Sequence, residues 1–155
     1  MSHHVATIRW SRKPDEPFLD GRYHRAHRWR FDGGAEVPAS ASPSVVRVPF
    51  SDPAGVDPEE ALVAALSSCH MLFFLDFAKQ VKFVVESYED EAEGVMEKGA
   101  DGRVRMTRAT LRPLIRFAGA APSAEVLAAI HTQAHEACYI ANSVTTEVKV
   151  ETRAG

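Results

Sequence analysis

The sequence predicts an α+β fold from two observations. Two segments have the caps and the apolar spacing of helices, residues 57–80 and 123–138. Five segments have the alternation or composition of strands: residues 5–10, 23–31, 83–96, 104–117 and 144–150. The resulting order of strands, helix, strands, helix and strand is typical of an α+β domain.

The first helix is the most strongly marked element. Asp57 is expected as its N-cap, with Glu60 at the capping-box position. Its apolar run, residues 61–78, approaches the length of a membrane span but contains His70 and Asp76. We therefore expect a buried core helix and no membrane partner.

The other segments follow from turn and loop signals. Gly99-Ala100-Asp101-Gly102 indicates a hairpin between the two long predicted strands. Residues 37–43 are small and include two prolines, so we expect a loop there.

Length and charge limit the function classes. The chain has 155 residues and 45% hydrophobic content, so we expect one domain over residues 1–155. A net charge of −3 gives no general attraction to nucleic acid, which is not an expected partner. The first residues lack the basic and apolar stretches of a signal peptide, which favours a cytoplasmic location.

The strand predicted over 23–31 places an arginine among aromatic residues. Its odd-numbered positions carry the aromatic side chains and should face inward, together with Arg25 and His27. Arg28 and Arg30 lie on the opposite face and can reach solvent. An inward-facing guanidinium needs an anionic partner, which a thiolate or a carboxylate would supply.

The chain has only two cysteines, too few for a disulfide-stabilised secreted scaffold. Cys69 lies about eleven residues into the first helix, too far from the helix N-terminus for the helix dipole to stabilise a thiolate. Cys138 lies near the end of the second helix, where a break before Asn142 would let it turn toward Cys69. The residues alone leave three uses open: redox chemistry, metal binding and core filling.

Metal binding is a specific alternative. His131, His135 and Cys138 follow H-x3-H-x2-C spacing on one helical face, and Cys69 or His70 could complete a zinc site. A hydrolytic H-E-x-x-H motif is absent, because position 132 is Thr.

Two sequence blocks resemble a known family. The first is Asp57-Pro58-Glu59-Glu60-Ala61-Leu62 followed by Ala64-Ala65-Leu66-Ser67-Ser68-Cys69. The second is His135-Glu136-Ala137-Cys138 with Asn142-Ser143. Both are similar to the signature blocks of the family of osmotically inducible protein C and organic hydroperoxide resistance protein, and the resemblance extends from about Arg22 to the end of the chain.

The resemblance implies an OsmC-like fold, with antiparallel sheets around a long central helix in an intertwined homodimer. It implies a thiol-dependent peroxidase that reduces organic hydroperoxides without a cofactor. Cys69 would be the peroxidatic thiol, Cys138 the resolving thiol, Arg25 the active-site arginine and Glu59 the carboxylate that holds it. Arg22 is the alternative arginine, but its strand parity points it away from the aromatic face.

An external dithiol of the lipoyl type would complete the cycle. Because Glu59 lies ten residues before Cys69, roughly 15 Å along a straight helix, it would act from a bent helix, from a loop or across a subunit boundary. Three departures from the family pattern bear on substrate choice: His70 replaces the usual Phe, Tyr139 replaces a frequent Pro, and His27 and Trp29 lie near Arg25. A family member that binds a small apolar ligand without catalysis is a further alternative.

Overall fold

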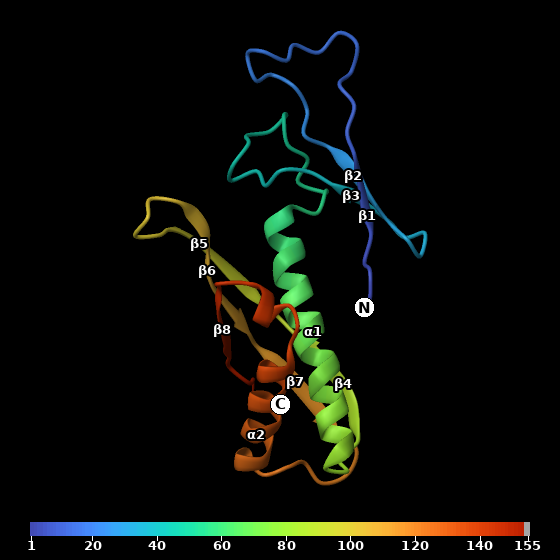
Figure 1. Ribbon diagram of the computed structural model, residues 1–155, viewed down its shortest axis with the longest axis vertical. Helices are drawn as coiled ribbons and strands as arrows, with labels where there is room; N and C mark the ends of the chain where they lie inside the picture. Colours follow the sequence, from blue (N-terminus) through green and yellow to red (C-terminus); the bar gives the residue numbers. More distant parts are fainter. Residues whose placement is uncertain (154–155) are drawn as a thin grey trace. The chain divides into compact units, whose positions relative to one another are not determined.

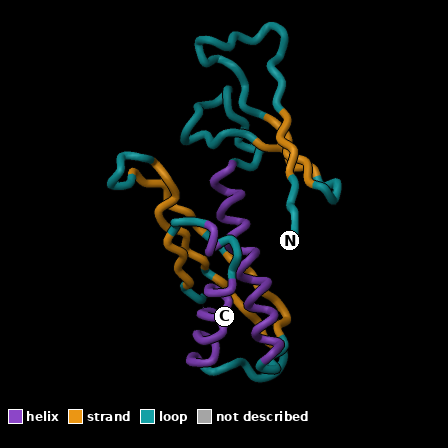
Figure 2. Tube along the Cα trace, viewed as in Figure 1, coloured by secondary structure: helices purple, strands orange, loops and turns teal. Residues whose placement is uncertain are grey.

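The computed structural model describes residues 1–153, which form two compact units. The first unit covers residues 1–61 and the second begins at Leu62. Helix α1, Pro58–Gln80, begins in the first unit and continues through the second. Figure 1 traces the elements in chain order, and Figure 2 separates helices, strands and loops. A single domain over 1–155 stays a prediction.

The first unit contains one antiparallel sheet in the order β1-β2-β3. Its strands are β1, Ala6–Arg9; β2, His27–Phe31; and β3, Glu36–Ala39. Trp29 pairs with Ile8 on one side and with Val37 on the other. The predicted strand 23–31 is therefore four residues too long at its start, and β3 occupies part of the segment expected as a loop.

Helix α1 begins where the sequence predicts. The Asp57 side chain accepts a hydrogen bond from the Glu60 N–H at 2.7 Å, and the Glu60 carboxylate accepts one from the Asp57 N–H at 3.1 Å. This reciprocal capping box satisfies backbone donors that the first turn would otherwise leave free.

The second helix, α2, Ala124–Ala137, is also confirmed. Ser123 caps it by accepting from the Val126 N–H at 3.4 Å, and Cys138 is the C-terminal cap. A short 3-10 helix follows, Ala141–Ser143.

The second unit has two small sheets. Strands β4, Val85–Asp90, and β7, Pro113–Phe117, pair antiparallel. Strand β6, Val104–Leu111, pairs antiparallel with β5, Glu93–Lys98, and parallel with β8, Glu147–Val150. The α+β class with two helices and mainly antiparallel sheets is confirmed, and the parallel β6–β8 pair is the exception.

Each of the two long predicted strands is two shorter strands in the structure. One carboxylate links the points of interruption to α1 through hydrogen bonds. Asp90, at the end of β4, accepts hydrogen bonds from the Arg112 N–H between β6 and β7 and from the Ser67 hydroxyl of α1, both at 2.5 Å. A buried backbone donor at a strand break needs such a partner. The alternation in the sequence continues across the breaks and therefore could not locate them.

The core of the second unit lies between α1, α2 and the β4–β7 sheet. Phe74 and Ala78 of α1 are buried against Ile130 and Ala134 of α2. Leu66, one turn earlier than His70 on the same stripe, packs with Met106 and Ala109 of β6. By length and composition α1 could cross a membrane. Its stripe of buried core residues instead gives it the role of the helix against which this unit is built.

We expect Asp57→Ala to lower the free energy of unfolding by about 1 kcal/mol, because the Glu60 N–H loses its acceptor. Urea denaturation followed by circular dichroism measures the change. Asp15→Ala is the matched control, since this exposed carboxylate makes no hydrogen bond or ion pair in the part of the chain described. Equal stability of the two variants would contradict the capping role.

Candidate functional site

The structure brings the two cysteines together. Cys69 projects from the middle of α1, and its thiol lies near enough to the thiol of Cys138, at the end of α2, to raise the pKa of Cys138. Both are free cysteines. Cys69 is half-buried, whereas Cys138 is only 1% exposed. A soluble reagent therefore has readier access to Cys69.

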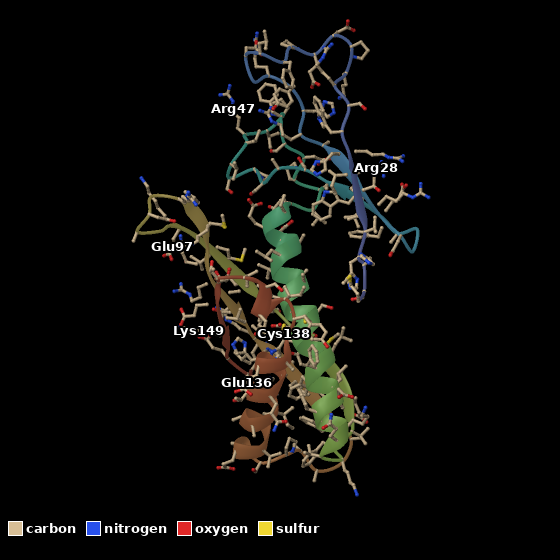
Figure 3. The ribbon with its side chains drawn as sticks, in the orientation of Figure 1. Arg28, Arg47, Glu97, Glu136, Cys138 and Lys149 are labelled. Atoms are coloured by element: carbon tan, nitrogen blue, oxygen red, sulfur yellow. The ribbon has the colours of Figure 1, made fainter. Side chains whose placement is uncertain are left out.

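The end of α2 holds Cys138 in this place. Its backbone leaves the helical conformation at φ −65° and ψ 109°, and its Sγ accepts from the Ala141 N–H at 3.4 Å. The Asn142 amide donates to the Glu136 carbonyl at 2.9 Å, and the Ser143 hydroxyl donates to the Tyr139 carbonyl at 2.6 Å. These bonds satisfy carbonyls that the end of a helix leaves open. Figure 3 labels Cys138 where the end of α2 lies beside α1.

The surroundings of Cys138 favour its neutral form. Burial raises the pKa of the Cys138 thiol, and the adjacent Cys69 raises it further through a hydrogen bond and charge repulsion. Cys138 is accordingly a thiol at neutral pH. A protonated, enclosed thiol suits the second step of a two-cysteine cycle better than the first.

Aromatic side chains lie next to the cysteine pair. The Tyr139 ring meets the Phe73 ring edge-on, with 5.0 Å between centroids, one turn beyond Cys69 on α1. Tyr139 is 72% exposed, so this contact is at the surface. Phe74 belongs to the core and is fully buried.

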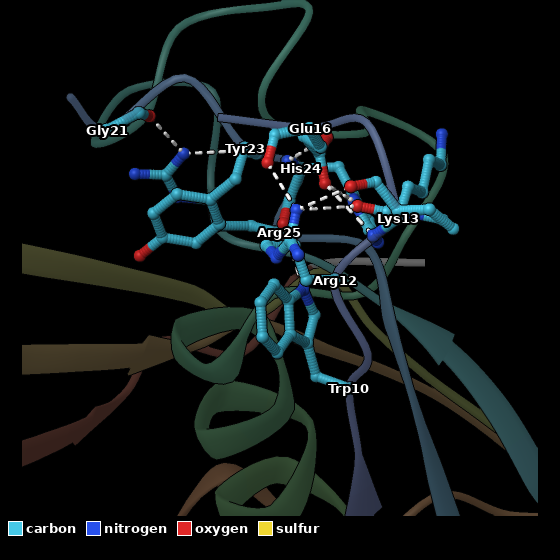
Figure 4. A network of polar contacts seen from close by, with 9 residues as sticks. Trp10, Arg12, Lys13, Glu16, Gly21, Tyr23, His24 and Arg25 are labelled. Carbon is cyan, nitrogen blue, oxygen red and sulfur yellow. Dashed lines mark hydrogen bonds and ion pairs between the residues drawn. The ribbon is translucent and has the colours of Figure 1, made fainter. Parts of the chain in front are cut away.

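Arg25 lies in the first unit, in an open pocket of about 450 Å³ whose walls include Trp10, Phe18 and Tyr23. Its guanidinium lies 3.7 Å from the centroid of the Tyr23 ring. It also donates to the carbonyls of Gly21, at 2.8 Å, and Tyr23. Figure 4 shows these contacts beside the hydrogen bonds between Glu16 and His24.

Arg25 precedes β2, and the even-numbered His24 and Ala26 are half-buried as well, so alternation of faces does not hold at this position. Arg25 and His27 are half-buried in this pocket, whereas Arg28 and Arg30 are exposed. Arg22, the alternative arginine, is exposed and pairs with Asp20 at 2.6 Å.

Glu59 and Arg25 do not form an ion pair in the protomer as far as residues 1–153 show. Glu59 is half-buried in the first turn of α1, so it belongs to the helix and not to a loop. The helix is unbroken from Glu59 to Cys69, a rise of roughly 15 Å. Glu59 therefore cannot contact the thiol of its own chain.

Two histidines meet between the helices. His70 Nε2 and His131 Nδ1 are 3.0 Å apart, and their rings stack with an angle of 8°. Their exposed fractions are 1% and 6%. Burial lowers the pKa of each imidazole to about 4, and nearby His135 lowers that of His70 further. Both rings are therefore neutral at pH 7 and share one hydrogen bond.

A family model described as OsmC-like protein matches residues 51–153. The chain belongs to the OsmC-like protein family. An OsmC-like protein of unknown function from Vibrio cholerae is 52% identical, with a TM-score of 0.95 over 99% of this chain and 100% of that chain. The comparison with curated proteins returned no match.

More distant solved structures share the fold. An organic hydroperoxide resistance protein from Elizabethkingia anophelis, with thiocyanate bound, is 16% identical, with a TM-score of 0.74 over 100% of this chain and 98% of that chain. The organic hydroperoxide resistance protein OhrB of Bacillus subtilis is 18% identical, with a TM-score of 0.68 over 98% of each chain. The OsmC-like fold predicted from the two sequence blocks is therefore confirmed.

The histidine pair is the feature of this OsmC-like protein that sequence reasoning missed. A signal was present, because His70 lies on the stripe of Leu66 and Phe74, and His131 lies on the stripe of Ala134. Two polar residues on the buried stripes of neighbouring helices can satisfy each other. Pairing across elements could not be read from the spacing within either helix.

The structure does not support the alternative metal site. Among the described residues, no three His, Cys, Asp or Glu side chains lie close enough together to hold a metal ion. His131 turns its Nδ1 to His70, while Cys138 turns its thiol to Cys69. Residues of the H-x3-H-x2-C motif therefore contact different partners and do not converge on one site.

The histidine pair predicts an acid-sensitive fold. The folded-state pKa of each ring, about 4, is below the ordinary value of 6.5. As the pH falls, these two histidines therefore take up protons in the unfolded chain before they do so in the folded protein. Their contribution to the free energy of unfolding is complete above pH 6.5 and is lost as the pH falls toward 4. Each ring contributes at most about 1.4 kcal/mol per pH unit.

Urea unfolding between pH 7 and pH 4 measures this slope. We expect a shallower loss of stability in His70→Phe/His131→Leu than in the wild type. His3→Gln/His4→Gln removes two exposed histidines and should leave the slope unchanged. Parallel slopes for all three proteins would show that the pair does not titrate as stated.

Proposed function

We propose that this OsmC-like protein is a cytoplasmic, thiol-dependent peroxidase that reduces organic hydroperoxides to alcohols. The observation that carries the proposal is the proximity of the Cys69 and Cys138 thiols at the junction of α1 and α2. Family membership supports it, and two of the structural relatives are organic hydroperoxide resistance proteins by name.

The roles of the two cysteines follow from their exposure. The half-buried Cys69 attacks first as a thiolate, and its sulfur bonds to one peroxide oxygen as the O–O bond breaks. The products are a Cys69 sulfenic acid and an alkoxide, which takes a proton to become the alcohol. Cys138 then attacks the sulfenic sulfur, water leaves with the thiol proton, and a disulfide forms.

Arg25 acts on the first step in this proposal. A guanidinium is always charged at neutral pH and stabilises both a thiolate and the developing charge on a peroxide oxygen. The hydrogen bonds of Arg25 in the protomer go to backbone carbonyls, so its charge is not neutralised by a carboxylate of the described chain. Glu59 acts as its carboxylate partner across a subunit boundary.

A homodimer supplies that boundary. Ile8 of β1 and Leu72 of α1 are 58% and 61% exposed in the single chain, which leaves apolar surface on both elements for a second copy to cover. An external dithiol, of the lipoyl type, reduces the disulfide by thiol exchange and completes the cycle. The Phe73 and Tyr139 rings beside the thiols favour a peroxide with an apolar body.

We expect one equivalent of cumene hydroperoxide to convert the reduced protein into a form with a Cys69–Cys138 disulfide inside one chain. Peptide mapping by mass spectrometry, without reductant, measures the bond. Cys138→Ser should instead accumulate sulfenic acid and higher oxides at Cys69. Two unreacted thiols in the wild-type protein would exclude the cycle.

A second prediction compares the half-buried Arg25 with the exposed Arg28. We expect Arg25→Ala to reduce kcat/KM for an organic hydroperoxide by about 100-fold, the usual cost of removing one charge-stabilising donor. Arg28→Ala, which changes an exposed arginine three residues away, should retain nearly full activity. Steady-state turnover with dihydrolipoamide tests both variants, and equal losses would remove Arg25 from the site.

A further inference from the structure

The backbone of Arg25 is held in place although it lies outside the sheet. Arg25 precedes β2, which begins at His27, so no strand pairing fixes it. Its N–H donates instead to the carbonyl of Phe50 at 2.8 Å. Its own carbonyl lies 2.7 Å from the Nδ1 atom of His27. Both main-chain polar groups of Arg25 therefore have partners outside regular secondary structure.

The guanidinium of Arg25 is fixed on one side and open on the other. Nη1 donates both side-chain hydrogen bonds, to the carbonyls of Gly21 and Tyr23, and the Tyr23 ring lies against the planar group. Within residues 1–153, Nε and Nη2 make no hydrogen bond. The N–H groups of these two nitrogens remain available to a thiolate or a peroxide oxygen. Where they point depends on where the Arg25 backbone is held.

Trp29 decides which nitrogen of His27 carries the proton. The Trp29 indole N–H donates to His27 Nε2 at 2.9 Å. An indole nitrogen is only a donor, so Nε2 is the acceptor and the proton of the neutral imidazole is on Nδ1. His27 Nδ1 therefore donates to the Arg25 carbonyl. A proton on Nε2 would instead place two N–H groups against each other and leave a lone pair of Nδ1 facing the carbonyl oxygen.

This chain of hydrogen bonds starts from a well-fixed residue. Trp29 lies in the central strand of the β1-β2-β3 sheet and pairs with Ile8 and Val37. The proposed function gives no role to Trp29 or His27, although both are departures from the family pattern. We propose that Trp29 and His27 are positioning residues for Arg25 in the peroxidase reaction, an inference that rests on the proposed function. They act through the Arg25 carbonyl and so direct the open side of its guanidinium.

Three variants separate positioning from packing. His27→Leu removes the donor to Arg25, whereas His27→Asn keeps one, because its amide nitrogen occupies the δ position as Nδ1 does. Trp29→Phe keeps an aromatic ring but removes the N–H that fixes the tautomer. The measurement is the single-turnover rate constant for oxidation of Cys69 by cumene hydroperoxide, without dithiol, followed by alkylation and mass spectrometry.

We expect His27→Leu to lower this rate constant about tenfold, because a small displacement of a group that stabilises charge is costly. Trp29→Phe should lower it about threefold, since the Arg25 carbonyl still favours a proton on Nδ1. His27→Asn should change it by less than about twofold, which makes it the matched control for His27→Leu. Thermal unfolding followed by circular dichroism checks that each variant is folded.

The decisive comparison repeats His27→Leu in an Arg25→Ala background. Arg25→Ala alone should lower the rate constant about 100-fold. A residue that acts only through Arg25 has nothing left to position there, so adding His27→Leu should change the rate constant by less than about twofold. An equal loss in both backgrounds would overturn the proposal, because His27 would then act on the substrate or the fold. An unchanged rate in Arg25→Ala alone would contradict the proposed function, whereas an unchanged rate in His27→Leu alone would contradict only the positioning role.

Nitrogen-15 NMR of the His27 imidazole tests the hydrogen-bonded chain independently of activity. We expect the proton on Nδ1 in the wild-type protein and a mixture of the two tautomers in Trp29→Phe. A proton on Nε2 in the wild-type protein would show that His27 does not donate to Arg25 and would overturn the proposal.

Discussion

The contact between α1 and α2 fixes the positions of the groups on which the proposed chemistry depends. Phe74 and Ala78 bury one face of α1 against Ile130 and Ala134 of α2. With that face fixed, His70 meets His131 and Cys69 meets Cys138, because each pair lies on the same two helices. A loss of packing here would separate both pairs at once. Apolar burial thus supplies the precision that the thiols need.

Local signals in the sequence predicted the elements well. The capping box at Asp57 placed the start of α1 correctly, and the apolar stripe placed the start of α2 near Ser123, which the structure shows to be its cap. The points at which the strands end were harder to predict. The breaks at Asp90 and Arg112 depend on a hydrogen bond between residues 22 positions apart, which alternation cannot reveal.

The candidate site shows the same division between local and distant information. Arg25 is half-buried and Arg28 is exposed, as predicted, but β2 begins only at His27, so strand parity does not explain the position of Arg25. Spacing could not show that Arg25 bonds to the carbonyls of Gly21 and Tyr23 and not to Glu59. It also suggested a metal site at His131 and Cys138, although their functional atoms face different partners. Side chains on one stripe of a helix point the same way, but each can contact a different residue.

The short segment after α2 has a further consequence for the proposed redox cycle. Cys138 is held by Ala141 and followed by Asn142 and Ser143, whose bonds stay within residues 136–143. The two sulfurs are already neighbours, so bond formation requires adjustment of this segment and not separation of the two helices. Because these hydrogen bonds stay within residues 136–143, a change of backbone at Cys138 can be absorbed there without altering the packing of Ile130 and Ala134 in the core.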